Sequence, residues 1–348
     1  MNKRIITGIA SFGMSGKVFH APLLSSHNGF HLKTIVERTK YEVKSLYPEV
    51  QVAHSIEEML NDNEIELVVI NTPDHTHAEF AHKALMAGKH VIVEKPLTLS
   101  ASEGEDLLNL AKRKKRKLTV FQNRRWDGDF LTVQKIIKSE LLGRLVEYEA
   151  HFDRFRNYIQ PNTWKEDASS GSGTLYNLGS HLIDQALVLF GMPETVFADI
   201  RTLRTNGQVD DFFDVHLNYK DLRVALKASY LVREPGPRYN LHGTNGSFLK
   251  YGLDPQEERL KQGHLPNNPG WGSEPENLWG TLNTEHQGLH YKGKIETIPG
   301  NYLAFYDNVY EALLHGNELY IKPEEAINVI KIIEAAIKSY ETDKLVKL

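Results

Sequence analysis

The sequence predicts an α/β protein with two domains, and three observations support this fold class. A chain of 348 residues has the length of two domains, since one domain takes about 100–200 residues. In the first third, short continuous apolar runs alternate with helix-like segments, which is typical of a parallel sheet with crossover helices. In the remainder, strand-like segments follow one another directly and alternate between apolar and polar residues, which indicates a mostly antiparallel sheet.

Short runs rich in β-branched residues predict the strands of the first domain. These runs are Arg4–Ala10, His31–Glu37, Glu66–Asn71, Lys89–Glu94 and Lys117–Phe121. Helices are expected over Ser55–Leu60, which starts with a capping-box pattern, over Thr76–Ala87, and over Ser100–Lys114. Repeated strand–helix–strand units form right-handed crossovers. Residues 1–121 are therefore expected to form a doubly wound parallel sheet.

Residues 122–348 are expected to form an α+β domain with a large, mostly antiparallel, open-faced sheet. Strands are predicted over Arg144–Arg154, Asp211–Tyr219, Leu222–Leu231 and Tyr239–Lys250, the last broken by a turn at 244–247. A helix is expected over Asp127–Ser139, and the helices Gly173–Phe190, Tyr302–Leu314 and Pro323–Tyr340 are expected to cover one face of the sheet. Residues 252–288 show no period and are expected to be a long loop. The uncovered face favours a homodimer or homotetramer.

The composition excludes several kinds of chemistry and of partner. The chain has no cysteine, which removes disulfides, iron–sulfur clusters, zinc–thiolate sites and a catalytic thiol. A net charge of −4 and the lack of a long apolar run favour neither nucleic acid nor a membrane as partner. The basic run Lys112–Lys117 is interpreted as the solvated end of a helix. No convincing signal peptide is present, so the cytoplasm is expected. The histidine spacing predicts no metal site.

The turn after the first expected strand is similar to a dinucleotide-binding loop. The fingerprint Gly-x-Gly-x-x-Gly stands at a strand-to-helix turn, and Ser11, Gly13 and Gly16 occupy its three positions. Gly13 lets the backbone approach a pyrophosphate, Gly16 lets the helix pack on the strand, and the helix N-terminus offers free N–H groups. Ser11 stands where the fingerprint has its first glycine, so Gly13 and Gly16 could alternatively be ordinary turn glycines with no cofactor. The alternation of strands and helices around them favours a Rossmann domain. The expected cofactor contacts here are Ser11, Phe12, Gly13, Met14, Ser15 and Gly16.

Two residues at the end of the second expected strand bear on the choice between NAD and NADP. Glu37 follows Gly16 by 21 residues, where a carboxylate can accept hydrogen bonds from the ribose hydroxyls and repel a 2′-phosphate. Arg38 stands next to it and can bind a 2′-phosphate instead. Glu37 favours NAD, and Arg38 leaves NADP open.

Lys95 follows a buried Val-Ile-Val run, within Glu94-Lys95-Pro96. In an open α/β sheet, ligands bind beyond the carboxyl ends of the strands, so Lys95 is expected near the nicotinamide. A solvated lysine at a strand end is the alternative, and the more common one for any single lysine.

Several spaced motifs together resemble the glucose–fructose oxidoreductase / inositol dehydrogenase (Gfo/Idh/MocA) family. In the first domain they are the Gly-rich turn, Thr72-Pro73-x-x-x-His77, Ala87–Val91 and Glu94-Lys95-Pro96. In the second they are Gln122–Asp127, Gly171–Asp184, Arg238–Gly243 and Gly246–Gly252, of which the last two look like the scyllo-inositol dehydrogenase-like branch. The resemblance covers nearly the whole chain.

The resemblance implies hydride transfer between NAD(P) and a secondary hydroxyl of a cyclitol or sugar, by a dehydrogenase acting on CH–OH groups. It places Lys95 at the reacting carbon and makes His181 the acid/base residue. An imidazole suits proton transfer near neutral pH, and an ammonium can hold a developing alkoxide. Asn177 stands where the family has an aspartate, so no ionisable group is expected there. The further cofactor contacts implied are Thr72, Pro73, His77, Glu94 and Lys95.

Residues early in the second domain are expected to bind a polyhydroxylated ring, by hydrogen bonds and stacking. Salt bridges and rim packing are the alternative role for each. The expected substrate contacts are Asn123, Arg124, Arg125, Trp126, Arg154, Trp164, Asn177 and His181.

Two other functions compete with a dehydrogenase. An NAD-dependent glycosidase would use transient oxidation without net NADH. A non-catalytic NAD(P)-binding sensor would lack the lysine and the histidine, yet Lys95 and His181 are both present. Asn177 is the one residue that favours an altered activity.

Overall fold

The computed structural model describes residues 3–39, 41–161, 163–168 and 171–348. The chain forms two compact units, and each is built from three segments. Unit 1 comprises Met1–Asn123, Gln256–Trp271 and Asn301–Ile327, whereas unit 2 comprises Arg124–Pro255, Gly272–Gly300 and Asn328–Leu348. Residues 1–121 therefore lie together in unit 1, but two segments of the expected second domain belong to unit 1 as well.

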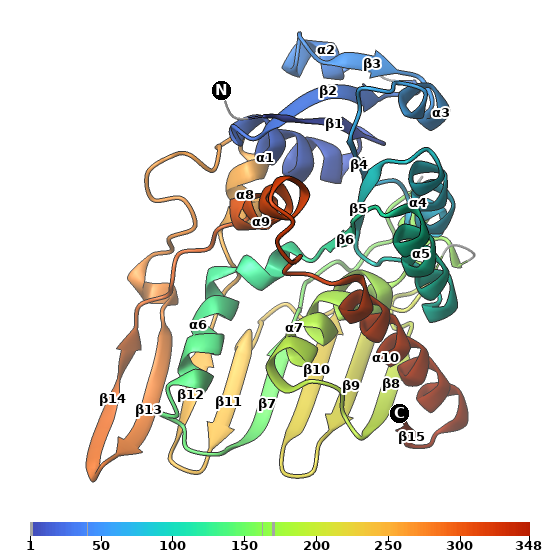
Figure 1. Cartoon of the computed structure of the whole chain (residues 1–348). Coiled ribbons are helices and arrows are strands. Elements are labelled where there is room, and N and C mark those ends of the chain that lie inside the picture. Colours follow the sequence, from blue (N-terminus) through green and yellow to red (C-terminus); the bar gives the residue numbers. More distant parts are fainter. Residues whose placement is uncertain (1–2, 40, 162, 169–170) are drawn as a thin grey trace. The chain divides into compact units, whose positions relative to one another are not determined.

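Unit 1 contains a parallel sheet of six strands in the order β3-β2-β1-β4-β5-β6 (Figure 1). The strands are β1 (Ile5–Ile9), β2 (Phe30–Val36), β3 (Gln51–Ala53), β4 (Leu67–Ile70), β5 (His90–Glu94) and β6 (Leu118–Phe121). The order reverses between β1 and β4, and such a reversal marks the place where ligands bind at the carboxyl ends of the strands. The predicted Rossmann fold is confirmed. The sequence did not reveal β3, because three residues are too few to show a pattern.

Helices connect these strands, and their starts follow from local caps. They are η1 (Gly16–His20), α1 (Ala21–Ser26), α2 (Val43–Leu46), α3 (Ile56–Leu60), η2 (Asp74–Thr76), α4 (His77–Met86) and α5 (Ala101–Lys114). Before α5, Ser100 and Glu103 form a complete capping box, in which each side chain accepts the backbone N–H of the other residue. Before α3, Ser55 accepts the N–H of Glu58, while the Glu58 carboxylate accepts from His54. Figure 1 shows α4 and α5 side by side.

The predicted helix Tyr302–Leu314 is present as α9 (Leu303–Leu314), but its expected place on the second sheet is wrong. It belongs to unit 1, where the Phe305 ring lies 4.9 Å from that of Phe121 and the Tyr306 ring lies 5.5 Å from that of Phe30, between centroids. An apolar period shows that a helix has a buried face, but not which sheet that face meets. α8 (Gln256–Lys261) also belongs to unit 1.

Unit 2 contains a sheet of nine strands in the order β14-β13-β12-β11-β7-β10-β9-β8-β15. They are β7 (Leu145–His151), β8 (Thr195–Arg201), β9 (Phe212–Asn218), β10 (Arg223–Ser229), β11 (Tyr239–Gly243), β12 (Gly246–Lys250), β13 (Gly280–His286), β14 (Leu289–Ile295) and β15 (Val346–Lys347). All neighbours are antiparallel except β7 and β10, which confirms the mostly antiparallel sheet.

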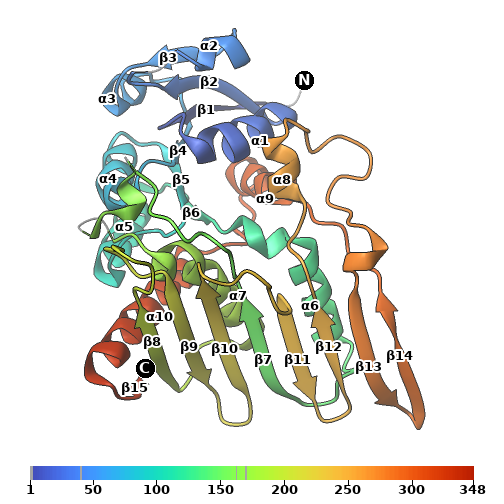
Figure 2. The ribbon, with the colours of Figure 1, turned by 180° about the vertical axis from the view of Figure 1, so that it is seen from behind.

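One face of this sheet carries α6 (Gly128–Lys138), α7 (Ser180–Phe190) and α10 (Pro323–Thr342), as Figure 1 shows. Fully buried aromatic rings, among them Tyr148, Phe213 and Phe248, build the core. Figure 2 shows the opposite face, over which none of the described helices lies. The open face expected from the sequence is therefore present.

The expected loop over residues 252–288 is wrong in part, because it contains α8, η7 (Glu276–Leu278) and β13. The hairpin of β13 and β14 escaped prediction because most residues of β14 are exposed, so the strand shows no apolar alternation. Within the described ranges, no helix is both long and apolar enough to cross a membrane.

Candidate functional site

The turn between β1 and η1 is held by its own polar groups. The Ser11 Oγ accepts the N–H of Gly13 at 3.2 Å, and Lys17 donates its N–H to the Gly13 carbonyl at 3.0 Å. A Cβ on Gly16 would lie only 2.3 Å from the Ser11 carbonyl oxygen, whereas one on Gly13 would meet nothing closer than 3.5 Å. The strand–helix packing thus requires glycine at 16, as predicted, and leaves space beside residue 13.

Asn71 is a part of this loop that the sequence analysis missed. Its Nδ2 donates to the Ser11 carbonyl at 2.8 Å and lies 3.4 Å from the Ser15 Oγ. The amide therefore ties the end of β4 to the turn after β1, across the point where the strand order reverses. Its place at the carboxyl end of a buried strand, just before Thr72, was the available signal.

Glu37 is buried, and its carboxylate binds the backbone of the next helix. One oxygen accepts the N–H of Glu42 at 2.9 Å and the other accepts the N–H of Val43 at 3.3 Å. These are the amides at the start of α2, where a negative charge is favourable. Arg38, the next residue, is exposed. The spacing that placed Glu37 at a ribose did not reveal this structural role.

His77 ties together the loops that follow β4 and β5. Its side chain is fully buried, with Nδ1 at 2.7 Å from the Pro96 carbonyl oxygen and Nε2 at 2.9 Å from that of Thr72. His77, which was predicted as a cofactor contact, is thus a buried residue whose two ring nitrogens position the backbone of Thr72 and Pro96. Lys95 directly precedes Pro96 at the carboxyl end of β5, and its side chain is partly exposed.

In unit 2, His181 stands in the first turn of α7, directly after a π-helical turn. That turn is η6 (Leu175–Gly179) and contains Asn177. His181 is buried and Asn177 is half-buried. A π-helical turn also opens the helix of the glycine-rich loop, as η1. Such turns are frequent at functional sites.

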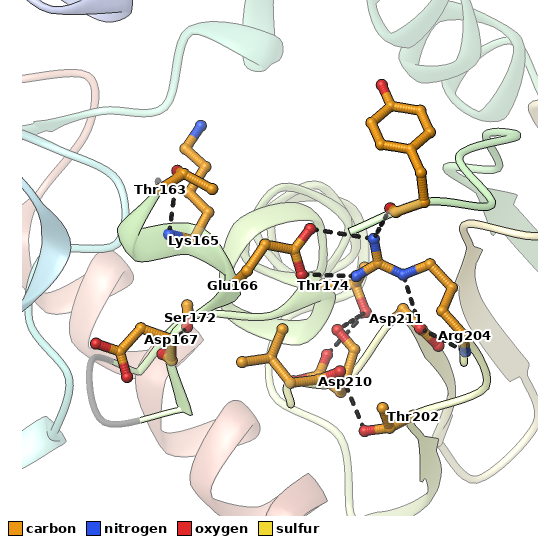
Figure 3. A network of polar contacts seen from close by, with 12 residues as sticks. Thr163, Lys165, Glu166, Asp167, Ser172, Thr174, Thr202, Arg204, Asp210 and Asp211 are labelled. Carbon is orange, nitrogen blue, oxygen red and sulfur yellow. Dashed lines mark hydrogen bonds and ion pairs between the residues drawn. The ribbon is translucent and has the colours of Figure 1, made fainter. Parts of the chain in front are cut away.

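Asp210 anchors the start of the helical segment that carries Asn177 and His181 (Figure 3). One of its carboxylate oxygens accepts the Thr174 hydroxyl and the Leu175 N–H, each at 2.7 Å. A Cβ on Gly173, whose φ is +103°, would lie 2.0 Å from the other oxygen. Burial raises the pKa of Asp210 in spite of these hydrogen bonds. This anchor was not predictable from the sequence, since Asp210 is 35 residues from Leu175.

Arg204 forms a second anchor in the same region, and Figure 3 shows its guanidinium between two carboxylates. It binds both oxygens of Glu166, at 2.9 and 3.1 Å, and one oxygen of Asp211 at 2.9 Å. It also donates to the Tyr158 carbonyl at 2.8 Å. Arg204 therefore fixes the segment that contains Trp164, which is half-buried in η4 (Trp164–Glu166), against the connection between β8 and β9.

Two of the three arginines predicted in the second domain, Arg124 and Arg125, are engaged in ion pairs. Arg125 forms two hydrogen bonds with Asp184, at 2.6 and 2.8 Å, and both side chains are buried. Arg124 pairs with Asp127 at 3.2 Å. Arg124 and Arg125 thus form the salt bridges that were one of their two alternative roles, and their contact with substrate stays a prediction. Asn123 is buried and Trp126 is half-buried, both in η3 (Asn123–Trp126).

The ring of Phe152 connects His181 to a cluster of guanidinium groups. The His181 ring lies 6.5 Å from the Phe152 ring. Arg124, Arg154 and Arg238 lie 4.9, 5.4 and 4.4 Å from the same ring, within the range of cation–π attraction. Arg238 is buried and was not predicted, because its position relative to His181 depends on the sheet. Among the described residues, no group of three or more His, Cys, Asp or Glu is placed to hold a metal ion.

Comparison with known proteins identifies both parts of the chain. Residues 5–122 match the profile described as "Oxidoreductase family, NAD-binding Rossmann fold", and residues 134–348 match "Oxidoreductase family, C-terminal alpha/beta domain" of the same family. Together the two matches cover nearly the whole chain.

Individual relatives agree with these matches over their full length. The chain is 41% identical to the scyllo-inositol 2-dehydrogenase (NADP(+)) IolW of Bacillus subtilis, over 99% of this chain and 96% of that protein. A crystal structure of a putative oxidoreductase from Bacteroides fragilis has 51% identity and a TM-score of 0.91, over 99% of this chain and 100% of that one. The putative oxidoreductase yvaA of Bacillus subtilis has 40% identity and a TM-score of 0.97, over 100% and 99%.

Proposed function

Because this chain belongs to the Gfo/Idh/MocA oxidoreductase family, we propose that it transfers a hydride between NADP and a secondary hydroxyl of a cyclitol or sugar. That it is an NAD(P)-dependent oxidoreductase follows from the family, and the resemblance predicted from the motifs is confirmed. The single observation that carries the proposal is the partly exposed Lys95 at the carboxyl end of β5, in a Rossmann sheet whose loop at Gly16 fits a dinucleotide. The similarity to a scyllo-inositol 2-dehydrogenase supports a cyclitol as substrate.

The residues of unit 1 fit a dinucleotide. The turn of Ser11, Gly13 and Gly16 leads into a helix N-terminus, where backbone N–H groups and a partial positive charge favour phosphates. Space beside Gly13 allows the pyrophosphate to approach the backbone. When bound, the nicotinamide accepts or returns the hydride.

Lys95 and His181 supply the remaining chemistry in this proposal. Oxidation of an alcohol removes a proton from oxygen as hydride leaves carbon, and the imidazole of His181 accepts that proton. The ammonium of Lys95 stabilises the negative charge that develops on the oxygen, and in the reverse reaction it donates a hydrogen bond to the carbonyl. Asn177 binds a substrate hydroxyl through its amide, but it takes no proton, since an amide does not ionise.

The surroundings of Glu37 and Arg38 support NADP over NAD. Glu37 holds two backbone amides of α2, and the neighbouring guanidinium of Arg38 is exposed and can pair with a 2′-phosphate. We expect Arg38→Ala to weaken NADP binding by about tenfold or more, because a charge-assisted hydrogen bond is worth ~1.5–3 kcal/mol, and to leave NAD binding nearly unchanged. The control is Lys44→Ala, which removes a cation of α2 that donates to the Pro48 carbonyl. Equal loss of both cofactors in Arg38→Ala would contradict a role at the 2′-phosphate.

A screen of the purified protein tests the function. Inositols and aldoses are offered with NAD and with NADP, and the absorbance of the reduced nicotinamide is followed. We expect turnover with a cyclitol or sugar, and its loss in Lys95→Ala and in His181→Ala. Product release without net reduction of cofactor would favour an NAD-dependent glycosidase. Cofactor binding without turnover of any polyol or sugar would favour a sensor.

The helix-free face of the nine-stranded sheet supports self-association, so we propose a homodimer or homotetramer, with the cytoplasm as its compartment. Light scattering should give a multiple of the mass of the 39.7 kDa chain. A monomer mass would contradict the proposal.

A further inference from the structure

A chain of buried polar side chains ends at the backbone of Lys95 and is not used in the proposed chemistry. His20, the last residue of η1, is fully buried and lies between two partners. Its Nδ1 is 2.7 Å from the Tyr306 hydroxyl, and its Nε2 is 3.1 Å from one carboxylate oxygen of Glu94. The other oxygen of Glu94 accepts the backbone N–H of Lys95 at 3.1 Å.

Each contact in this chain has one donor and one acceptor. An ionised carboxylate only accepts, so the proton shared by His20 and Glu94 is on Nε2. The Tyr306 hydroxyl can donate or accept and therefore satisfies Nδ1. One oxygen of Glu94 accepts a hydrogen bond from the imidazole and the other accepts one from the Lys95 backbone amide. These two hydrogen bonds fix the orientation of the carboxylate.

The surroundings of the chain are aromatic, which makes its polar groups costly unless they serve a purpose. The His20 ring lies 4.5 Å from the Phe121 ring, and the Tyr306 ring lies 5.2 Å from that of Phe305. Buried polar and charged groups are often replaceable by apolar ones without loss of stability. Their presence next to the proposed catalytic lysine therefore points to a role beyond packing.

The charged and titratable groups around Glu94 keep it ionised. They are His20 on η1, Tyr306 on α9, His77 on α4 and Lys95 on its own strand end. Burial by itself would raise the pKa of Glu94, but the hydrogen bond from His20 and the attraction of His20, Lys95 and His77 lower it below its usual value. Burial also raises the pKa of Tyr306, so its hydroxyl stays protonated.

We infer that His20 and Tyr306 are positioning residues for Lys95: they hold Glu94 as an oriented carboxylate, which fixes the Lys95 backbone and favours its side chain as an ammonium. This inference rests on the proposed role of Lys95. The ammonium is the form that stabilises an oxyanion, so loss of the chain reduces the fraction of competent enzyme at high pH.

The test measures the protonation of Lys95 without turnover. The full-length protein is acetylated with acetic anhydride over a series of pH values, and mass spectrometry gives the rate at Lys95, because only the neutral amine reacts. The pH profile of kcat/KM is recorded in parallel. Removing a neighbouring carboxylate charge lowers the pKa of a lysine, and we expect the midpoint in Glu94→Gln to fall by about one pH unit or more. His20→Phe should shift this midpoint in the same direction, and Tyr306→Phe should shift it by less.

Two variants separate positioning from simple packing. His27→Asn removes another contact of α9, since the His27 Nε2 lies 3.0 Å from the Asp307 carboxylate, and it should leave both profiles unchanged. His20→Gln keeps a side-chain donor for Glu94 and should restore most of the wild-type profile. If His20→Phe does not fold, the inference is tested by Glu94→Gln, because the glutamine amide has nearly the same shape as the carboxylate that it replaces. A folded Glu94→Gln variant with wild-type acetylation and kcat/KM profiles would overturn the inference. An active Lys95→Met variant would instead overturn the proposed function, while the acetylation of Lys95 in the other variants could still be interpreted.

Discussion

The two units hold their candidate residues in place by different means. In unit 1, the glycine-rich turn is held by a local contact of Ser11 with Gly13 and by Asn71, which follows the neighbouring parallel strand β4. In unit 2, the supporting contacts join distant segments, such as those of Leu175 with Asp210 and of Tyr158 with Arg204, 35 and 46 residues apart. Parallel strand ends place residues by topology, whereas the segment around Trp164 and the helix of His181 depend on particular buried ion pairs and hydrogen bonds. We therefore expect unit 2 to be more sensitive to changes away from the reacting groups.

The largest effect is expected at His181. Removal of a general base costs ~10²–10⁴-fold in turnover, and His181→Asn should show a loss of this size in kcat while cofactor binding stays at its wild-type level. His216→Asn, in β9 of the same unit, is the matched control and should keep most of the activity. A fully active His181→Asn would remove His181 from the reaction.

Next in size is the loss of the Arg204 anchor. Arg204→Met leaves the buried carboxylate of Asp211 and the half-buried carboxylate of Glu166 without their cation, which costs ~3–5 kcal/mol in the free energy of unfolding. Urea denaturation gives this value, and KM should rise because the segment around Trp164 is no longer held. Arg201→Met breaks an exposed ion pair with Asp199 and should cost no more than ~1 kcal/mol. Equal costs for the two variants would contradict the anchoring role of Arg204.

A smaller, local effect is expected in the glycine-rich loop of unit 1. In Gly16→Ala the new methyl group meets the Ser11 carbonyl, and such overpacking costs ~1–3 kcal/mol of stability. In Gly13→Ala the methyl group has space, so thermal denaturation should be nearly unchanged while cofactor binding weakens. Unimpaired cofactor binding in Gly13→Ala would show that the pyrophosphate does not approach this residue.

The smallest effects are opposite pH dependences at two aspartates of unit 2. Burial raises the pKa of Asp210, so its contribution to stability is present below the ordinary value of 3.8 and is lost as the pH rises through the raised pKa. At Asp214, burial opposes ionisation, but His216, Lys227 and His151 lower the pKa below 3.8. Its contribution is therefore present above pH 3.8 and is lost as the pH falls through the lowered pKa.

Unfolding measured against pH for Asp210→Asn and Asp214→Asn checks these signs. The free energy of unfolding of Asp210→Asn, relative to that of the wild type, should increase as the pH rises. That of Asp214→Asn should increase as the pH falls. If the free energies of unfolding of both variants changed with pH in the same direction, the Asp210 carboxyl would not have a pKa raised by burial.

Much of unit 1 was predictable from the sequence, because strand ends and glycine spacing are local signals. Gly16 and the position of Lys95 were predicted in this way, whereas the amide contacts of Glu37 were not, since they depend on where α2 begins. The family resemblance supplied His181. Its supports were not predictable, because Asp210 and Arg238 meet the region of His181 only through the packing of distant strands. For the same reason, nothing in the sequence linked His20 to Tyr306, which lies 286 residues away.

The most direct test of the central claim follows the hydride itself. The protein is incubated with the ketone of its best polyol substrate and NADPH carrying deuterium at C4 of the nicotinamide, and the product is analysed by mass spectrometry. We expect a single deuterium on the carbon that becomes CH–OH in the wild type, and no labelled product with Lys95→Met or His181→Asn. If the product forms without deuterium, whichever face of the nicotinamide carries the label, the result would contradict hydride transfer and, with it, the proposal that the chain is a cyclitol or sugar dehydrogenase.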